Sequence, residues 1–339
     1  MEISEFKSQL KSSMKDLIAE FIERKRLAGN YLSDDSIRFF VNFDSFMFKF
    51  FPSETCINKN VSYKFIEEIS KRVSNNTVIR ILTPIRQFAK YLIAIGNDSI
   101  IPEIPCKYIR YNCHLITTDE LVAFFKSADT LPASSHHDSL REITAPVCFR
   151  LLYSSGLRTG EVRRLSVNDV NLESGKIFIR ESKAHQLRIV IVSDDMLKVL
   201  RNYDHKVNQI APNRTSFFVK NINGQSLKAH SINMWFHDIW DNLPEAKVQK
   251  MPKMTSRDFR HCFAFNCITK WYKEGRDINS IADYLVTYMG HSDFAQSSYY
   301  IHLAEIAIPE LRNSIHRIDD GILPDIDSMI DDDEVPYDA

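Results

Sequence analysis

Apolar residues recur at helical spacing through the first hundred positions. Residues 3–27 place apolar side chains three and four positions apart, with lysines and glutamates between them, which predicts one amphipathic helix. The same pattern predicts helices over 34–51, 61–73 and 74–96, which have Ser, Asp or Asn near their starts as caps. Pro84 lies inside the last of these segments and should kink or divide that helix.

Helical patterns return in the second part of the chain. A threonine at 117 or 118 precedes acidic residues and an apolar face, so a capped helix should cover residues 116–129. Residues 143–168 predict a buried helix, a turn at SSGLRTG and a second helix. Helical patterns dominate again from residue 257 onward.

Between these helices the hydrophobic pattern becomes alternating. The runs GKIFIRES (175–182) and QLRIVIVS (186–193) are rich in β-branched residues and follow turn residues, which predicts a small antiparallel hairpin. A further short strand and turn are expected over 217–227, before a helix over 230–243. The pattern as a whole predicts a mainly α fold with a small antiparallel β-sheet.

The two differently patterned halves are separated by residues 101–114. This segment contains two prolines, several basic residues and no clear period, as a linker does. We therefore expect a helical domain over 1–100 and a second domain over 115–318. Residues 319–339 carry nine acidic residues and no lysine or arginine, which predicts a solvated, disordered tail.

The net charge of −1 is unevenly distributed. Outside residues 319–339 the chain has 43 lysines and arginines against 35 acidic residues, a net charge of +8 that indicates a polyanionic partner. Charged residues interrupt the N-terminus every few positions, which argues against a signal peptide, and no segment is apolar for long enough to span a bilayer. A cytoplasmic protein is expected.

The cysteines and histidines do not form a recognisable metal site. The six cysteines include no CxxC pair, so reduced structural thiols are expected. The sequence has no HExxH motif, Walker loop or phosphate-linked DxD cluster. The histidines are scattered, and His261, His302 and His316 are interpreted as packing or surface residues. We expect no cofactor and no metal.

A first arginine lies where an anion could bind. Arg158 follows a glycine at a helix start, where backbone N–H groups also face outwards. Glu161, three residues later, would share its helical face and could hold the guanidinium. An ordinary surface arginine remains the alternative interpretation.

Two further arginines lie near a second helix start. Thr255 or Ser256 can cap a helix on which Arg257 and Arg260 share one face. The guanidinium fork matches pairs of phosphate oxygens, so this pair could clamp a phosphate. A solvated basic face explains the pair almost as well.

Three more residues complete an ordered series: Lys183 in the predicted hairpin turn, His291 after a glycine, and Tyr300 nine residues later. The series resembles the catalytic domain of the tyrosine recombinases, the family of lambda-type integrases, Cre-like enzymes and Xer resolvases. The matching segments are GLRTGEVRRL, ESKAHQLRIVIVS, DFRHCFAF, MGHSDFAQSSYY and YIHL. The helical region over roughly 10–100 is similar to the family's core-binding domain, so the resemblance covers nearly all of the chain except its tail.

The resemblance implies a catalytic site and a role for each of its members. Arg158 and Arg260 would hold the scissile phosphate, and Lys183 would protonate the leaving 5′ oxygen. His291 would hydrogen-bond a non-bridging oxygen, and Tyr300 would be the nucleophile. Tyr299 is then a packing or positioning neighbour.

Arg257 departs from the family pattern, which usually has a histidine three residues before the second arginine. Arginine can neutralise a phosphate, but it cannot shuttle a proton near neutral pH. Whether base catalysis is weakened or passes to another group stays open.

The resemblance implies a site-specific DNA recombinase, the integrase or transposase of a mobile element, which cuts and rejoins DNA through a 3′-phosphotyrosyl intermediate without metal or ATP. Cationic side chains can stabilise the charge that builds on the phosphate in the transition state. One alternative is a catalytically weakened DNA-binding architectural or regulatory protein of the same fold. A relaxase of the type IB topoisomerase kind shares the chemistry but would act within one duplex.

The resemblance also implies partners. Double-stranded DNA is the substrate, the working form should be a homo-tetramer on two paired sites, and accessory or sister recombinases are candidate partners. Residues 304–318 resemble the family's final helix and would link neighbouring subunits in a ring. No membrane partner is expected, and the DNA-bound protein should associate with the bacterial nucleoid.

Overall fold

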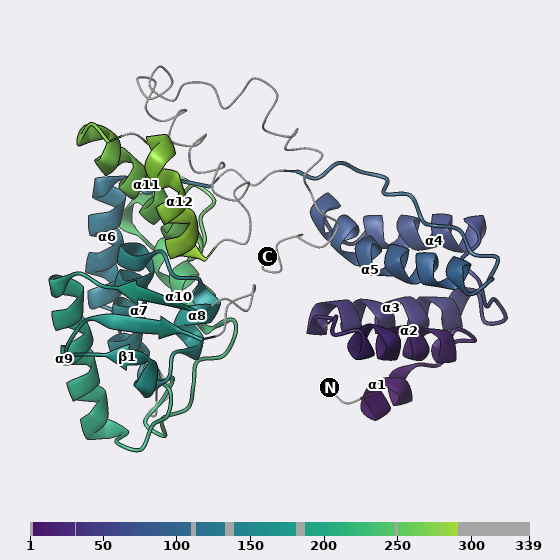
Figure 1. The fold of residues 1–339 in the computed structure, drawn as a ribbon, viewed down its shortest axis with the longest axis horizontal. Helices are drawn as coiled ribbons and strands as arrows, with labels where there is room; N and C mark the ends of the chain where they lie inside the picture. The colour runs from purple at the N-terminus through teal and green to yellow at the C-terminus, as the bar shows by residue number, and fades with distance from the viewer. Residues whose placement is uncertain are drawn as a thin grey trace. The chain divides into compact units, whose positions relative to one another are not determined.

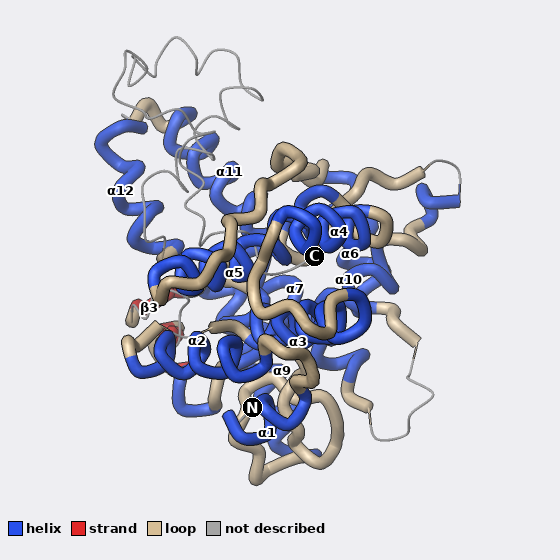
Figure 2. Tube along the Cα trace, turned by 90° about the vertical axis from the view of Figure 1, so that its right-hand side faces the viewer, coloured by secondary structure: helices blue, strands red, loops and turns tan. Residues whose placement is uncertain are grey.

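The protein is described by a computed structural model that divides into two compact units, with the division between residues 111 and 112. The described residues are 3–30, 32–109, 113–132, 139–180, 187–247, 250–276 and 278–290. Each unit has its own hydrophobic core. Helices make up most of both units, and short strands occur in the second (Figures 1 and 2). The predicted mainly α fold with a small antiparallel sheet is confirmed.

The first unit is helical throughout its described secondary structure (Figure 2). Its helices are α1 (Ile3–Gln9), α2 (Lys15–Leu27), α3 (Asp34–Phe50), α4 (Lys59–Ser70) and α5 (Asn75–Ala94). Phe21, Phe40 and Phe88 bring α2, α3 and α5 together, with ring centroids 5.5–5.9 Å apart. Helix α5 continues through Pro84, so of the two expected outcomes, a kink or a division, the structure excludes the division.

The single helix expected over residues 3–27 is also wrong, because the chain breaks between α1 and α2. The carboxylate of Asp44, on α3, accepts hydrogen bonds from the backbone N–H groups of Lys11 and Ser12 and from the Ser12 hydroxyl. The same hydroxyl accepts a bond from the N–H of Met14. A serine side chain that bonds nearby backbone competes with the helical pattern, and these bonds hold residues 11 and 12 in the turn between the two helices.

The second unit packs its helices around an aromatic core. Its helical segments are α6 (Thr118–Asp129), α7 (Arg141–Ser155), α8 (Thr159–Arg164), η1 (Val167–Asp169), α9 (Asp194–Ile210), α10 (Ser231–Trp240), η2 (Pro244–Lys247), α11 (Asp258–Lys273) and α12 (Ile278–Met289). Phe124 of α6 lies 5.2 Å from the rings of Phe149, Phe236 and Phe259, and so joins α6 to α7, α10 and α11. Thr117 caps α6 with Glu120 in a capping box, as expected.

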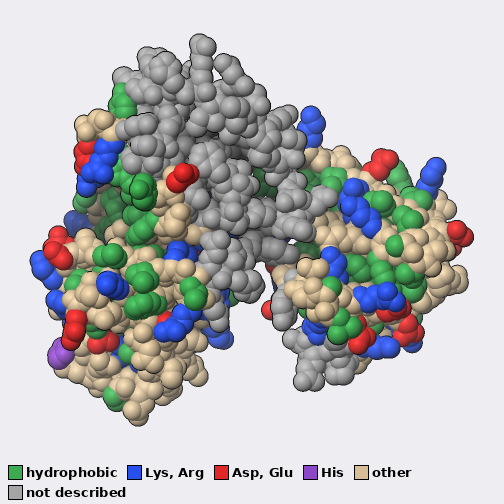
Figure 3. Space-filling view, in the orientation of Figure 1, with side chains coloured by type: hydrophobic (Ala, Val, Ile, Leu, Met, Phe, Trp, Pro, Cys, Tyr) green, Lys and Arg blue, Asp and Glu red, His purple; other side chains and the backbone are tan. Residues whose placement is uncertain are grey.

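This unit also contains a three-stranded antiparallel sheet (Figure 1). Its strands are β1 (Val170–Asn171), β2 (Lys176–Ile179) and β3 (Arg188–Ile191), in the order β1-β2-β3. Side chains alternate across the sheet, so Ile177 and Val190 are buried while Phe178 and Ile189 are exposed. The predicted hairpin is confirmed. On the face drawn in Figure 3, basic and acidic side chains are interspersed over the described parts of both units.

The strand expected over residues 217–227 is wrong. Isolated bridges take its place, including one between Val219 and Ser226 across a turn in which Gly224 has φ +70°. Phe217 and Phe218 are both buried and pack on Tyr203, so the apolar run reflects core packing and not a continuous strand. Among the described residues, no helix is long and apolar enough to cross a membrane.

Candidate functional site

The turn between α7 and α8 sets the position of Arg158. Helix α7 ends at Gly156, whose φ is +63° and whose N–H bonds the carbonyl of Leu152. A Cβ at this position would lie 2.4 Å from the ring of Phe263, so only glycine fits both the backbone conformation and the space. Arg158 then begins α8 as its N-cap, at a helix start as the sequence predicts.

Glu161 binds Arg158 at two points, which confirms the predicted contact. The backbone N–H of Arg158 donates to Oε2 of Glu161 at 2.9 Å, and its Nη1 donates to Oε1 at 3.1 Å. The Glu161 side chain is only 1% exposed, whereas that of Arg158 is 28% exposed. The carboxylate is therefore a buried anchor for a guanidinium that still reaches solvent.

A second arginine, Arg188 at the start of β3, binds the same carboxylate. Its Nη1 and Nη2 donate to Oε1 and Oε2 of Glu161 at 2.9 and 2.8 Å, a bidentate pair. Burial by itself raises the pKa of Glu161, but the hydrogen bonds and charges of Arg188 and Arg158 outweigh it and hold that pKa below its ordinary value. Glu161 is therefore ionised near neutral pH.

Three arginines converge on the last carbonyl groups at the end of α12. Nε of Arg188 donates to the oxygen of Tyr288 at 2.9 Å. Nη2 of Arg260 donates to the oxygen of Met289 at 2.7 Å, and Nη2 of Arg158 donates to that of Gly290 at 3.0 Å. The C-terminal carbonyls of a helix lack intrahelical donors and carry partial negative charge, so cations suit this position.

Arg260 is itself buried, with 5% of its surface exposed. Besides Met289, it binds the carbonyl oxygen of Gly156 through Nη1 at 2.6 Å. This side chain, from the first turn of α11, therefore ties the turn before Arg158 to the end of α12. The structure brings Arg158 and Arg260, two of the expected site residues, to adjacent peptide groups.

Arg257, the third expected site arginine in the described chain, is the N-cap of α11, one turn before Arg260. The expectation that Thr255 or Ser256 caps this helix is wrong. Instead, the N–H and the hydroxyl of Thr255 both donate to the Asp258 carboxylate. The threonine hydroxyl is therefore a donor here, whereas a capping hydroxyl would accept a bond from a backbone N–H of the helix. Burial and the charges of Arg260 and Arg257 lower the pKa of the neighbouring His261 to about 4, which leaves that imidazole neutral at pH 7.

Lys183, His291, Tyr299 and Tyr300 lie outside the described residues. The described chain nevertheless reaches both sides of Lys183, at Arg180 and Leu187, and ends at Gly290, directly before His291. Among the residues that the structure describes, no group of three or more His, Cys, Asp or Glu side chains could hold a metal ion.

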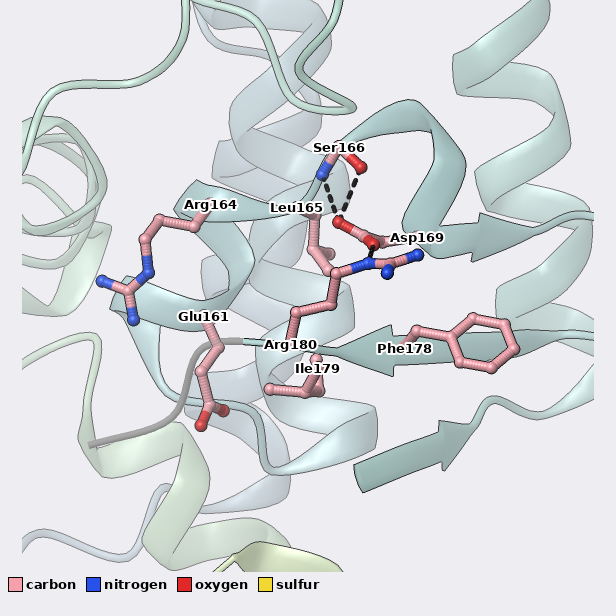
Figure 4. Close-up of a pocket in the computed structure, with 8 residues that line it drawn as sticks. All are labelled: Glu161, Arg164, Leu165, Ser166, Asp169, Phe178, Ile179 and Arg180. Atoms are coloured by element: carbon pink, nitrogen blue, oxygen red, sulfur yellow. Dashed lines mark hydrogen bonds and ion pairs between the residues drawn. The ribbon is translucent and has the colours of Figure 1, made fainter. Parts of the chain in front are cut away.

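A pocket of about 340 Å³ opens next to Glu161, and Figure 4 shows the eight residues that line it. Asp169 accepts bonds from the N–H and hydroxyl of Ser166 at 2.9 and 2.7 Å and also binds Nε of Arg180. These bonds outweigh the effect of burial and lower the pKa of Asp169. The Arg180 side chain is 65% exposed, so the pocket has a cationic edge directly after β2.

Arg188 is the site residue that the sequence argument missed. It lies in the strand QLRIVIVS, two positions before the buried Val190, and so shares the inward face of β3. An arginine at an inward strand position needs a buried partner, because an unpaired buried charge is costly. The alternation of inward and outward positions along β3 was the sequence signal that could have identified Arg188.

Known proteins resemble this chain at both the sequence and the fold level. The model of the phage integrase family matches residues 114–306. Tyrosine recombinase XerD of Staphylococcus epidermidis is 25% identical over 252 residues, which cover 72% of this chain and 77% of that protein.

Two solved structures, each 13% identical, share the fold. The Tn1549 transposon integrase in complex with a circular intermediate DNA has a TM-score of 0.61, with 86% of this chain and 95% of that chain covered. The lambda integrase tetramer bound to a Holliday junction has a TM-score of 0.59, with 84% and 76% covered.

Proposed function

Because the chain belongs to the phage integrase family, the tyrosine recombinases, which are DNA strand-transfer enzymes, we propose that it recombines duplex DNA through a 3′-phosphotyrosyl intermediate. One observation carries the proposal. Arg158 and Arg260, which are far apart in sequence, bind the adjacent carbonyls of Gly290 and Met289, directly before His291. Two guanidinium groups therefore bind the main chain at the two residues that directly precede His291 in the sequence.

In the proposed reaction, the oxygen of Tyr300 attacks the scissile phosphorus. A P–O bond to tyrosine forms as the P–O5′ bond breaks, which leaves a 3′-phosphotyrosyl link and a 5′ hydroxyl. The phenolic proton of Tyr300 passes to solvent water, and the ammonium group of Lys183 gives a proton to the leaving 5′ oxygen. A phenol has a pKa near 10, so cations around the phosphate must lower the barrier to attack.

Arg158, Arg260 and His291 supply that stabilisation in the proposed site. Donors that are fixed before the reaction stabilise charge on the non-bridging oxygens without reorganisation. The phosphotyrosyl ester keeps the energy of the broken bond, so attack by another 5′ hydroxyl rejoins the strands without ATP and without a metal. Arg257 adds charge near the phosphate but cannot exchange a proton at neutral pH.

The domain roles and the assembly belong to the same proposal. Residues 1–100 are assigned as the core-binding domain, 115–318 as the catalytic domain and 101–114 as the linker. The lambda integrase neighbour is a tetramer on a Holliday junction, which supports a tetramer on paired sites here, and the Tn1549 transposon integrase supports a mobile-element role.

The test is covalent capture of DNA by the full chain. A duplex is first selected for binding from a random-sequence pool and then nicked at successive positions, so that the short cleaved strand diffuses away. Wild type should form a protein–DNA adduct that survives denaturation, Tyr299→Phe should also form it, and Tyr300→Phe should not.

Each failure has a distinct meaning. DNA binding by wild type without any adduct would reject the strand-transfer proposal and favour the DNA-binding architectural or regulatory protein. An adduct that persists in Tyr300→Phe and disappears in Tyr299→Phe would move the nucleophile by one residue.

A further inference from the structure

Arg188 takes no part in the proposed chemistry, yet it contacts two of the segments that hold the site together. It is bidentate to Glu161 on α8, and its Nε binds the carbonyl of Tyr288 on α12. Its side chain is 8% exposed. A Cβ at Gly290 would lie 2.7 Å from Nη1 of Arg188, so the guanidinium packs closely against the end of α12.

Arg158 and Arg188 share one carboxylate oxygen of Glu161. Oε1 of Glu161 accepts from Nη1 of Arg158 at 3.1 Å and from Nη1 of Arg188 at 2.9 Å. The Glu161 side chain is 1% exposed, so water competes little for its oxygens. The direction in which Arg158 extends is therefore set by a carboxylate whose own orientation is set by Arg188.

The combined charge of the Arg158, Glu161 and Arg188 side chains decides how strongly an incoming phosphate is attracted. Arg158, Glu161 and Arg188 together carry a net charge of +1, whereas Arg158 and Glu161 alone carry none. Without Arg188, the buried carboxylate would draw Arg158 inward and compensate its charge. An incoming phosphate would then compete with Glu161 for the same guanidinium.

We propose that Arg188 is a positioning residue of the recombinase: it binds Glu161 and the peptide at Tyr288 so that Arg158 stays directed at the scissile phosphate with its charge uncompensated. This inference rests on the proposed function. It assigns Arg188 a role in the chemical step, and not in the recognition of DNA sequence.

The experiment measures single-turnover cleavage and duplex binding with the selected nicked DNA and the full chain. Arg188→Met should slow cleavage by about 100-fold, the size of effect that a misplacement of about 1 Å can produce. The dissociation constant for the duplex should change little. Arg188→Lys keeps the charge but not the bidentate fork, so it should recover part of the rate.

Arg214 provides a matched control in the same unit. Its side chain is also buried and binds the side chains of Asp204 and Asn208. Arg214→Met should lower the melting temperature as Arg188→Met does, and it should cleave at close to the wild-type rate when both are assayed well below melting.

The double variant Arg188→Met/Glu161→Gln separates positioning from general support of the fold. Removal of the carboxylate charge restores the net +1, so the double variant should cleave faster than Arg188→Met alone. A cleavage rate no faster than that of Arg188→Met would overturn the positioning role, because a purely structural loss would not be relieved by a second buried substitution.

Two further outcomes would overturn the inference. A wild-type cleavage rate in Arg188→Met would exclude a role in the chemical step while the recombinase function stands. The absence of an adduct with wild type would reject the proposed function and the role of Arg188 with it.

Discussion

A buried carboxylate organises each unit, but Asp44 in the first and Glu161 in the second have different partners. Asp44 is fully buried and accepts from two backbone N–H groups and a serine hydroxyl, all of which are neutral. Glu161 is 3% exposed and binds two guanidinium groups. The neutral donors around Asp44 satisfy its charge and fix a loop. The two guanidinium groups around Glu161 satisfy its charge and also give the cluster a net positive charge, which a phosphate-transfer site needs.

The largest expected effect is on the cleavage rate, and it follows from the loss of a cation in the second unit. Arg260→Met removes the donors to Gly156 and Met289 and one of the two arginines proposed to hold the scissile phosphate. Cleavage of the nicked duplex should fall by about 10³-fold, as for the loss of a donor to a developing charge. Cleavage within a few-fold of wild type, measured below the melting temperature, would place the phosphate elsewhere.

The next effect concerns stability alone and lies in the first unit. Asp44→Ala leaves three donors without their acceptor and should lower the free energy of unfolding by about 3 kcal/mol. Asp44→Asn keeps one oxygen and should cost less. Urea denaturation measures both, and the cleavage rate of the folded variant should stay at the wild-type level. A loss of cleavage with an unchanged unfolding free energy would contradict this division of roles.

The smallest effect is the pH dependence of the Glu161 contribution. Its folded-state pKa is lower than its ordinary value of 4.5 because of Arg188 and Arg158, with burial opposing them. The stabilisation is therefore fully present above about pH 4.5 and is lost as the pH falls through the folded-state pKa. The difference in unfolding free energy between wild type and Glu161→Gln should shrink as the pH falls from about 6 to 3. A difference that grows would reverse the assigned sign.

Local sequence pattern was sufficient for the features that depend on near neighbours. The apolar stripe and threonine cap of α6, the alternation of β2 and β3, and the contact of Arg158 with Glu161 all act within one turn or one hairpin. Those parts of the fold and site follow from periodicity and capping.

The features that were missed depend on distant partners. The break between α1 and α2 depends on Asp44, which is 32 residues from Ser12 in sequence. The role of Arg188 depends on Glu161, 27 residues away, and on Tyr288, 100 residues away. No local window contains both members of such a pair. Helical spacing and the resemblance to a family both pointed to Arg260, but neither gave a role to Arg188.

The three arginines at the end of α12 bind oxygen atoms of the main chain, which every amino acid possesses. Side-chain substitution at Tyr288 or Met289 would leave those acceptors in place, so a conventional mutational scan there would report packing and miss the contact. A semisynthetic protein with an ester in place of one peptide bond would weaken a single carbonyl acceptor. To test these contacts, the backbone carbonyls directly before His291 should therefore be changed, and not the side chains.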